Sequence, residues 1–160
     1  MTTTYPRETV DGFVEVSRLL TGFETFELYG TGMAELYLET MIDQVGEAAY
    51  QEFVFALDRA DRDPEKIQDE VAQDIARAVT HLWYLGVWPQ LSASAHGKLR
   101  REKPNVAFTA APEAYVEGLV WRTFHGHPPG AKPPGFGTWA APPPGAPEIP
   151  APQQQAGGTS

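Results

Sequence analysis

The most regular alternation of apolar and polar residues lies between Asp63 and Trp88. Asp63 is a favourable N-cap and Pro64 suits a first helical turn, so we predict a helix that begins here. Apolar residues then recur at spacings of three and four, which places them on one face of the helix. They are Ile67, Val71, Ile75, Ala78, Val79 and Leu82.

The end of this central helix loses its polar face. Residues 81–88 read His-Leu-Trp-Tyr-Leu-Gly-Val-Trp, and Gly86 with Pro89 predicts where the helix stops. An apolar end of this kind is unfavourable in water. We therefore expect it to be covered, either by another part of the chain or by a partner.

The same periodicity predicts four more helices, and together with the central one they make an all-α fold. We predict helices over residues 9–21, 33–43, 47–57 and 112–123, and loops over 23–30 and 92–105. The predicted architecture is a compact bundle of about five helices, which fills a helical domain over residues 1–124.

Proline dominates the chain after this domain. Residues 125–143 combine closely spaced prolines with Phe136 and Trp139, so we predict an extended strap, because proline at this density is incompatible with helices and sheets. Its aromatic side chains are useful only if they dock, on this chain or on a partner. Residues 144–160 have no aromatic side chain, and we predict a disordered tail.

Composition excludes several classes of protein. The chain has 12 Lys and Arg against 21 Asp and Glu, a net charge of −9, which disfavours nucleic acids and anionic membranes as partners. It has no cysteine, which excludes disulfides, iron–sulfur clusters and covalently attached c-type haem. No apolar run reaches about 18 residues and no export signal precedes the first helix, so we expect a soluble chain.

Candidate catalytic chemistry is sparse. His125 and His127 form a His-x-His pair, but a metal site needs a third ligand, so we predict no metal. His81 lies on the apolar helix end and is interpreted as a hydrogen-bonded core residue. Glu70 and Asp74 are one turn apart on the polar face, which favours solvated carboxylates over an acid–base pair. We predict neither catalytic nor cofactor-binding residues in this chain.

A cluster of basic residues follows the central helix. Lys98, Arg100, Arg101 and Lys103 stand close together in an otherwise acidic chain. Two interpretations remain open, a docking site for an acidic partner and a solvated loop.

Four groups of residues resemble a known family. They are Ser17-Arg18-Leu19-Leu20-Thr21-Gly22, Trp83-Tyr84-Leu85-Gly86-Val87, Tyr115 with Gly118-Leu119-Val120-Trp121, and Pro128-Pro129-Gly130 followed by Gly135-Phe136-Gly137-Thr138-Trp139-Ala140 and Pro142-Pro143. In this order they resemble the small subunits of membrane-associated FAD-dependent sorbitol, glucose and fructose dehydrogenases. They are also similar to the third subunit of gluconate 2-dehydrogenase.

The resemblance implies a noncatalytic small subunit. Such a subunit binds and matures a large flavoprotein of the glucose-methanol-choline class, which holds the FAD and often passes electrons to a cytochrome c subunit. Relatives commonly carry a twin-arginine export signal and a cysteine before the Gly-x-Trp segment. This chain has neither, so the resemblance implies noncovalent binding, and either periplasmic co-export with the partner or a cytoplasmic location. Alternatives are a transient maturation or export chaperone and a freestanding interaction module.

The predicted contacts with the partner are aromatic, because aromatic side chains dominate interface anchors. They are Trp83, Tyr84, Trp88, Tyr115, Trp121, Phe136 and Trp139. For Trp83 and Tyr115, burial in the chain's own core is the alternative interpretation.

Overall fold

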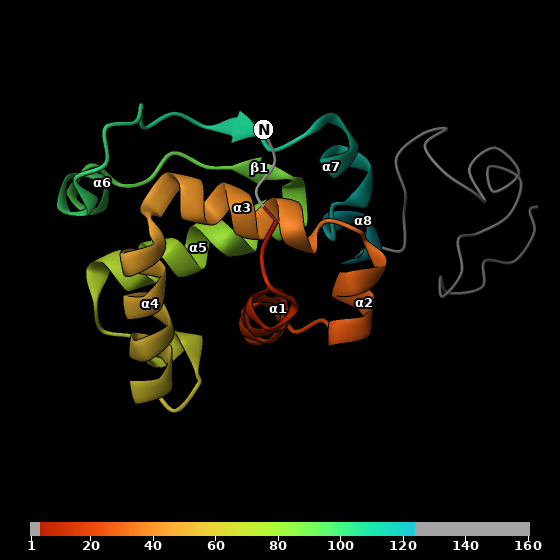
Figure 1. The fold of residues 1–160 in the computed structure, drawn as a ribbon, viewed down its shortest axis with the longest axis horizontal. Helices are drawn as coiled ribbons and strands as arrows, with labels where there is room; N and C mark the ends of the chain where they lie inside the picture. The colour runs from red at the N-terminus through yellow and green to blue at the C-terminus, as the bar shows by residue number, and fades with distance from the viewer. Residues whose placement is uncertain (1–3, 124–160) are drawn as a thin grey trace, which may run out of the picture. The chain divides into compact units, whose positions relative to one another are not determined.

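The computed structural model describes residues 4–123 and confirms an all-α fold (Figure 1). The chain divides into two units, Met1–Leu119 and Val120–Ser160. Of the elements within residues 4–123, the first unit holds all but one. These are α1 (Arg7–Thr21), α2 (Thr25–Gly30), α3 (Ala34–Val45), α4 (Glu47–Arg59), the 3-10 turn η1 (Pro64–Lys66), α5 (Glu70–Leu85), β1 (Val87–Trp88), α6 (Ala93–Leu99), β2 (Phe108–Thr109) and α7 (Pro112–Glu117). Of the second unit only α8 (Val120–Thr123) is described, and the predicted strap and tail lie outside the described residues.

Helix α5 is the centre of the first unit. It contacts α1, α3, α4, α6 and β1, and Figure 1 shows it crossing the middle of this unit. Its apolar stripe is buried as predicted, with Ile75, Ala78, Val79 and Leu82 at most 1% exposed. None of the described helices has the length and the hydrophobicity that a membrane crossing requires.

The predicted start of the central helix is wrong: the helix begins at Glu70 and not directly after Asp63. Asp63 does accept a hydrogen bond from the Glu65 amide, but it caps only η1. The backbone then extends through the buried Ile67, and Asp69 caps α5 by accepting from the amide of Ala72 at 2.9 Å. Two aspartate N-caps thus follow one another, and the long helix uses the second.

Two segments predicted as loops are helical. Residues 25–30 form α2, which begins with a capping box in which Glu24 and Glu27 bond each other's backbone amides. Glutamate is a rare N-cap, which is why the pattern did not predict this helix. Residues 93–99 form α6, whose N-cap Ser92 accepts from the amide of Ala95 at 3.1 Å.

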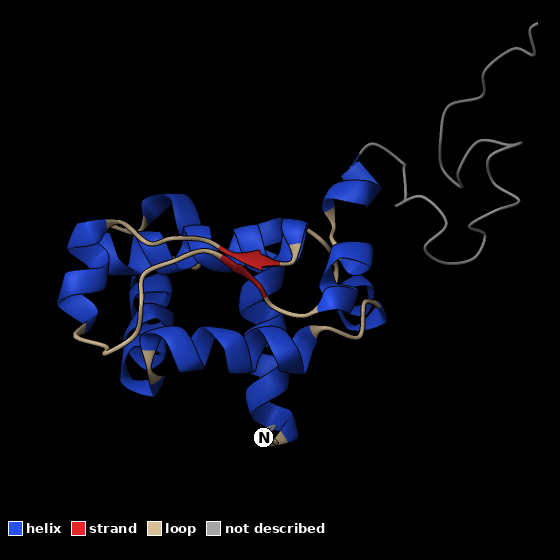
Figure 2. Cartoon of the chain, turned by 90° about the horizontal axis from the view of Figure 1, so that it is seen from above, coloured by secondary structure: helices blue, strands red, loops and turns tan. Residues whose placement is uncertain are grey.

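The predicted last helix is interrupted at Gly118, whose extended backbone separates α7 from α8. Before it, β1 and β2 pair antiparallel, with Val87 opposite Thr109 and Trp88 opposite Phe108 (Figure 2). The amide of Leu119 donates to the carbonyl of Trp83 at 3.0 Å. The chain after β2 is therefore fastened to the last turns of α5.

Two glycines allow this attachment. Gly86 ends α5 with a left-handed backbone, φ 73°, and a Cβ atom there would lie 2.7 Å from the Ala114 backbone. A Cβ atom on Gly118 would lie 2.5 Å from the carbonyl oxygen of Tyr84. Both distances are shorter than any normal contact, so only glycine lets α7 and its C-terminal end approach α5 this closely.

We predict that Gly86→Ala destabilises the fold by about 2 kcal/mol or more, because it adds backbone strain to a clash with Ala114. The matched control is Gly97→Ala in α6, where a Cβ atom meets nothing within 4 Å and the helix gains propensity. Urea denaturation of both variants measures the difference. Equal stabilities would contradict the steric role of Gly86.

Candidate functional site

The predicted contact residue Trp83 lies in the core, and its prediction as a partner contact is corrected. Its side chain is 0% exposed, stacked on Phe13 at 6.2 Å and edge-on to Tyr37 at 4.9 Å between ring centroids. The indole Nε1–H donates to Ser17 Oγ at 2.8 Å, and the Ser17 hydroxyl donates in turn to the Phe13 carbonyl at 2.8 Å. The apolar end of α5 is thus covered mainly by the chain itself.

Trp88 is corrected in the same way, because it is 1% exposed. It lies in β1 opposite Phe108, where the strand pair brings it into the core. Trp121 is partly exposed and belongs to α8, in the second unit. Phe136 and Trp139 lie outside the described residues.

Tyr84 and Tyr115 lie at the surface. Tyr84 is half-buried, and its hydroxyl donates to the Thr21 carbonyl at 3.2 Å while its ring packs edge-on to Phe23. Tyr115 is 53% exposed on α7. The contact of Gly86 with Ala114 brings α7 against the end of α5, so the two tyrosines belong to elements that meet there.

Two further apolar side chains belong to this region and were not among the predicted contacts. Leu85 is 42% exposed and Phe108 is 36% exposed. Leu85 directly precedes Gly86, and the strand of Phe108 is tied to Gly86 by the bond from the Ala110 amide to the Gly86 carbonyl. We call Tyr84, Leu85, Phe108 and Tyr115 the terminal surface. The signal that could have identified Phe108 is its alternation with Val106, which is also exposed.

A shallow apolar groove of about 380 Å³ continues the terminal surface along α5. Tyr84 and Leu85 belong to both, and Thr80 and Ala76 lie one and two turns earlier on the same helix. Leu20 of α1 and Pro64 of η1 also line the groove. The lining of this groove is almost entirely apolar, which suits contact with apolar side chains.

The titratable groups near this region do not form a catalytic arrangement. His81 lines the groove, and its Nδ1 donates to the Val87 carbonyl at 3.0 Å, which confirms the predicted hydrogen bond although the ring is only half-buried. Elsewhere in the core, burial raises the pKa of Tyr50 to about 12 and also raises the pKa of Tyr37. Within residues 4–123, no group of three or more His, Asp or Glu could hold a metal ion.

The polar pair Glu70 and Asp74 is used for local structure. Glu70 accepts from Lys98 Nζ at 2.8 Å, and this bond lowers the pKa of the carboxyl group. Asp74 bonds Arg77 at 2.8 Å and accepts from the Ser92 amide at 2.8 Å. Both carboxylates therefore hold α5 to its neighbours.

Comparisons with models of protein families, with curated proteins and with solved structures find no match for this chain.

We predict that Ser17→Ala lowers the free energy of unfolding by about 1–3 kcal/mol, because it leaves the buried indole N–H of Trp83 without an acceptor. The double variant Ser17→Ala with Trp83→Phe should lose less than the sum of the two single losses, since the hydrogen bond is shared. Chemical denaturation of the four proteins gives this cycle. Strict additivity would show that the bond contributes nothing to stability.

Proposed function

We propose that this chain is the noncatalytic small subunit of an FAD-dependent sugar or polyol dehydrogenase. It binds and stabilises the large flavin-binding subunit of the glucose-methanol-choline class. The FAD belongs to that partner, and a cytochrome c subunit is a further partner of the same complex. The subunit reaches the periplasm by co-export with its partner or remains with it in the cytoplasm.

One observation carries the proposal. Three of the four residues of the terminal surface, all but Phe108, lie in groups through which the sequence resembles this family. Tyr84 and Leu85 belong to one of the resembling groups and Tyr115 to another, and Gly86 and Gly118 fasten these two groups together. A partner-binding role explains why apolar side chains stay exposed where the contacts of Gly86 and Gly118 hold α7 against α5.

The proposal also assigns separate tasks to the aromatic residues. Trp83 and Trp88 stabilise the subunit from within, because both are buried. Tyr84 and Tyr115 supply contact area, since tyrosine offers a large rigid surface and a hydroxyl group. Phe136 and Trp139 are proposed as further anchors on the large subunit.

We predict that Leu85→Asp weakens the complex with the flavin-binding subunit by about tenfold or more, because a carboxylate would be buried without a partner. Coexpression followed by size-exclusion chromatography should give a yellow stoichiometric complex with the unmodified chain and little with the variant. Binding constants from biolayer interferometry then give the size of the loss.

The matched control for this experiment is Phe55→Asp. Phe55 is 60% exposed on α4, outside the terminal surface, and Arg59 lies four residues on to pair with the new carboxylate. This variant should bind like the unmodified chain. A complex that tolerates Leu85→Asp as well as Phe55→Asp would rule out the terminal surface as the interface. A partner that is bound only during maturation and then released would favour the chaperone instead.

A further inference from the structure

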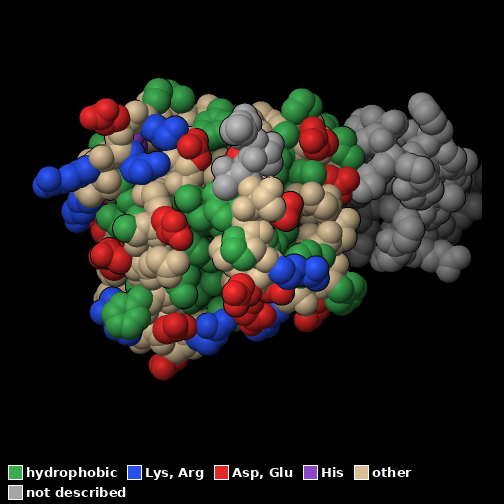
Figure 3. Space-filling view, in the orientation of Figure 1, with side chains coloured by type: hydrophobic (Ala, Val, Ile, Leu, Met, Phe, Trp, Pro, Cys, Tyr) green, Lys and Arg blue, Asp and Glu red, His purple; other side chains and the backbone are tan. Residues whose placement is uncertain are grey.

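The segment that follows α6 carries the strongest concentration of positive charge in an acidic chain. Lys98, Arg100, Arg101 and Lys103 lie within six residues, while the whole chain has a net charge of −9. Figure 3 shows Lys and Arg side chains gathered at the α6 end of this face. We call these four residues the basic patch. A basic patch on an acidic protein attracts an acidic partner to that patch, while the rest of the negatively charged surface repels the same partner.

The two lysines of the basic patch are paired only weakly. Lys98 Nζ lies 2.8 Å from Glu70 Oε1, and Lys103 Nζ lies 3.1 Å from Asp43 Oδ2. The side chains of both pairs are at least a third exposed, so water competes with each bond. Exposed pairs of this kind contribute little, and the lysines can turn toward an incoming carboxylate.

The two arginines retain unused donors. Arg101 Nη2 donates to the Asp43 carbonyl at 2.8 Å, but its Nε is buried without an acceptor. Arg100 ends α6 in the left-handed conformation, φ 56°, with its side chain exposed. Its guanidinium group makes no hydrogen bond or ion pair with any residue in the described part of the chain. A guanidinium group has five N–H donors, so Arg100 presents all five to a ligand, whereas Arg101 has its Nε buried and one Nη2 donor bonded to Asp43.

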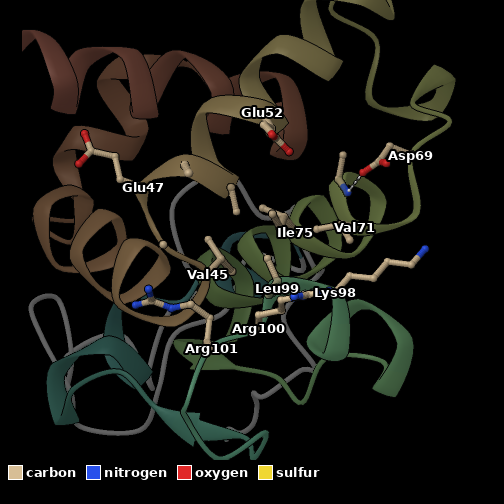
Figure 4. A pocket seen from close by; sticks show the side chains of 14 residues that line it. Val45, Glu47, Glu52, Asp69, Val71, Ile75, Lys98, Leu99, Arg100 and Arg101 are labelled. Atoms are coloured by element: carbon tan, nitrogen blue, oxygen red, sulfur yellow. Dashed lines mark hydrogen bonds between the residues drawn. The ribbon is translucent and has the colours of Figure 1, made fainter.

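A cleft of about 450 Å³, with an apolar floor and charged walls, lies beside the basic patch. Its floor combines side chains from α3, α4, α5 and α6, namely Val45, Ala49, Val71, Ala72, Ile75 and Leu99. Figure 4 shows Val45, Ile75 and Leu99 at its centre, with Lys98 and Arg101 extending to opposite sides. The cations therefore flank the apolar floor and leave it open.

The acidic side chains of the cleft set the direction of binding. Asp69 is occupied in capping α5, through its bond with the Ala72 amide. Glu47 and Glu52 belong to α4, on the side of the cleft opposite α6. An acidic ligand is thus repelled on the α4 side and attracted on the α6 side.

We propose that the cleft and the basic patch form a docking site for an acidic segment of a partner protein. The segment places an apolar side chain on Val45, Ile75 and Leu99, and its carboxylates bind Arg100 and Arg101. This inference rests on the proposed function in one respect, since it assigns the acidic segment to the flavin-binding subunit. The docking site is a second contact, separate from the terminal surface.

The first test uses a probe that does not depend on the partner, a fluorescein-labelled peptide Glu-Glu-Leu-Glu-Glu-Leu. We expect it to bind the unmodified chain, to bind more weakly as salt rises, and to lose affinity about fivefold in Arg100→Glu. Lys66→Glu is the matched control, because Lys66 is exposed on η1 and the change in net charge is the same. Fluorescence anisotropy measures each affinity. Absent binding, or equal losses in both variants, would overturn the docking site.

The second test uses the complex with the flavin-binding subunit and separates the two proposals. Arg100→Glu should weaken this complex about fivefold relative to Lys66→Glu. If the unmodified chain binds the flavoprotein and the two variants bind equally, the docking site is wrong and the proposed function stands. If the peptide test succeeds while the flavoprotein does not bind, the docking site stands and the proposed function is wrong.

Discussion

A tryptophan can be enclosed on every side only where its indole N–H finds an acceptor inside the protein. Ser17 supplies that acceptor for Trp83, and it does so from α1, 66 residues away in sequence. The bond fixes the orientation of α5 against α1, and Phe13 and Tyr37 then pack on the ring faces and edge. The strand pair and α7 are both attached to the end of α5, so their positions depend on how this helix is held.

The helical fold could be predicted because its long helices have complete apolar stripes. The stripe of α5 and the left-handed glycine that ends it were both readable from residue types and spacing. The short elements were not, because their signals are local and atypical. Glu24 serves as an N-cap within a capping box, which is unusual for glutamate. Ser92 caps a helix of only seven residues, whose polar sequence is typical of a loop.

The surface was harder to predict than the fold, because an aromatic residue at a helix end has the same sequence signal whether it is buried or exposed. Trp83 and Tyr84 are adjacent in sequence, but successive helical residues point in different directions, so Trp83 is buried in the core and Tyr84 lies at the surface. Phe108 was missed because its exposure depends on pairing with a distant strand. The cations after α6 were visible in the sequence, but the cleft beside them is built from four helices.

The close approach at Gly86 joins two parts of the chain that are nearly thirty residues apart. Leu85 comes from one part and Tyr115 from the other, so the terminal surface is discontinuous in sequence. A linear peptide copied from α5 would reproduce only one half of this epitope. Recognition at this end of the molecule therefore depends on the folded state, and any partner that binds here would distinguish a folded chain from an unfolded one.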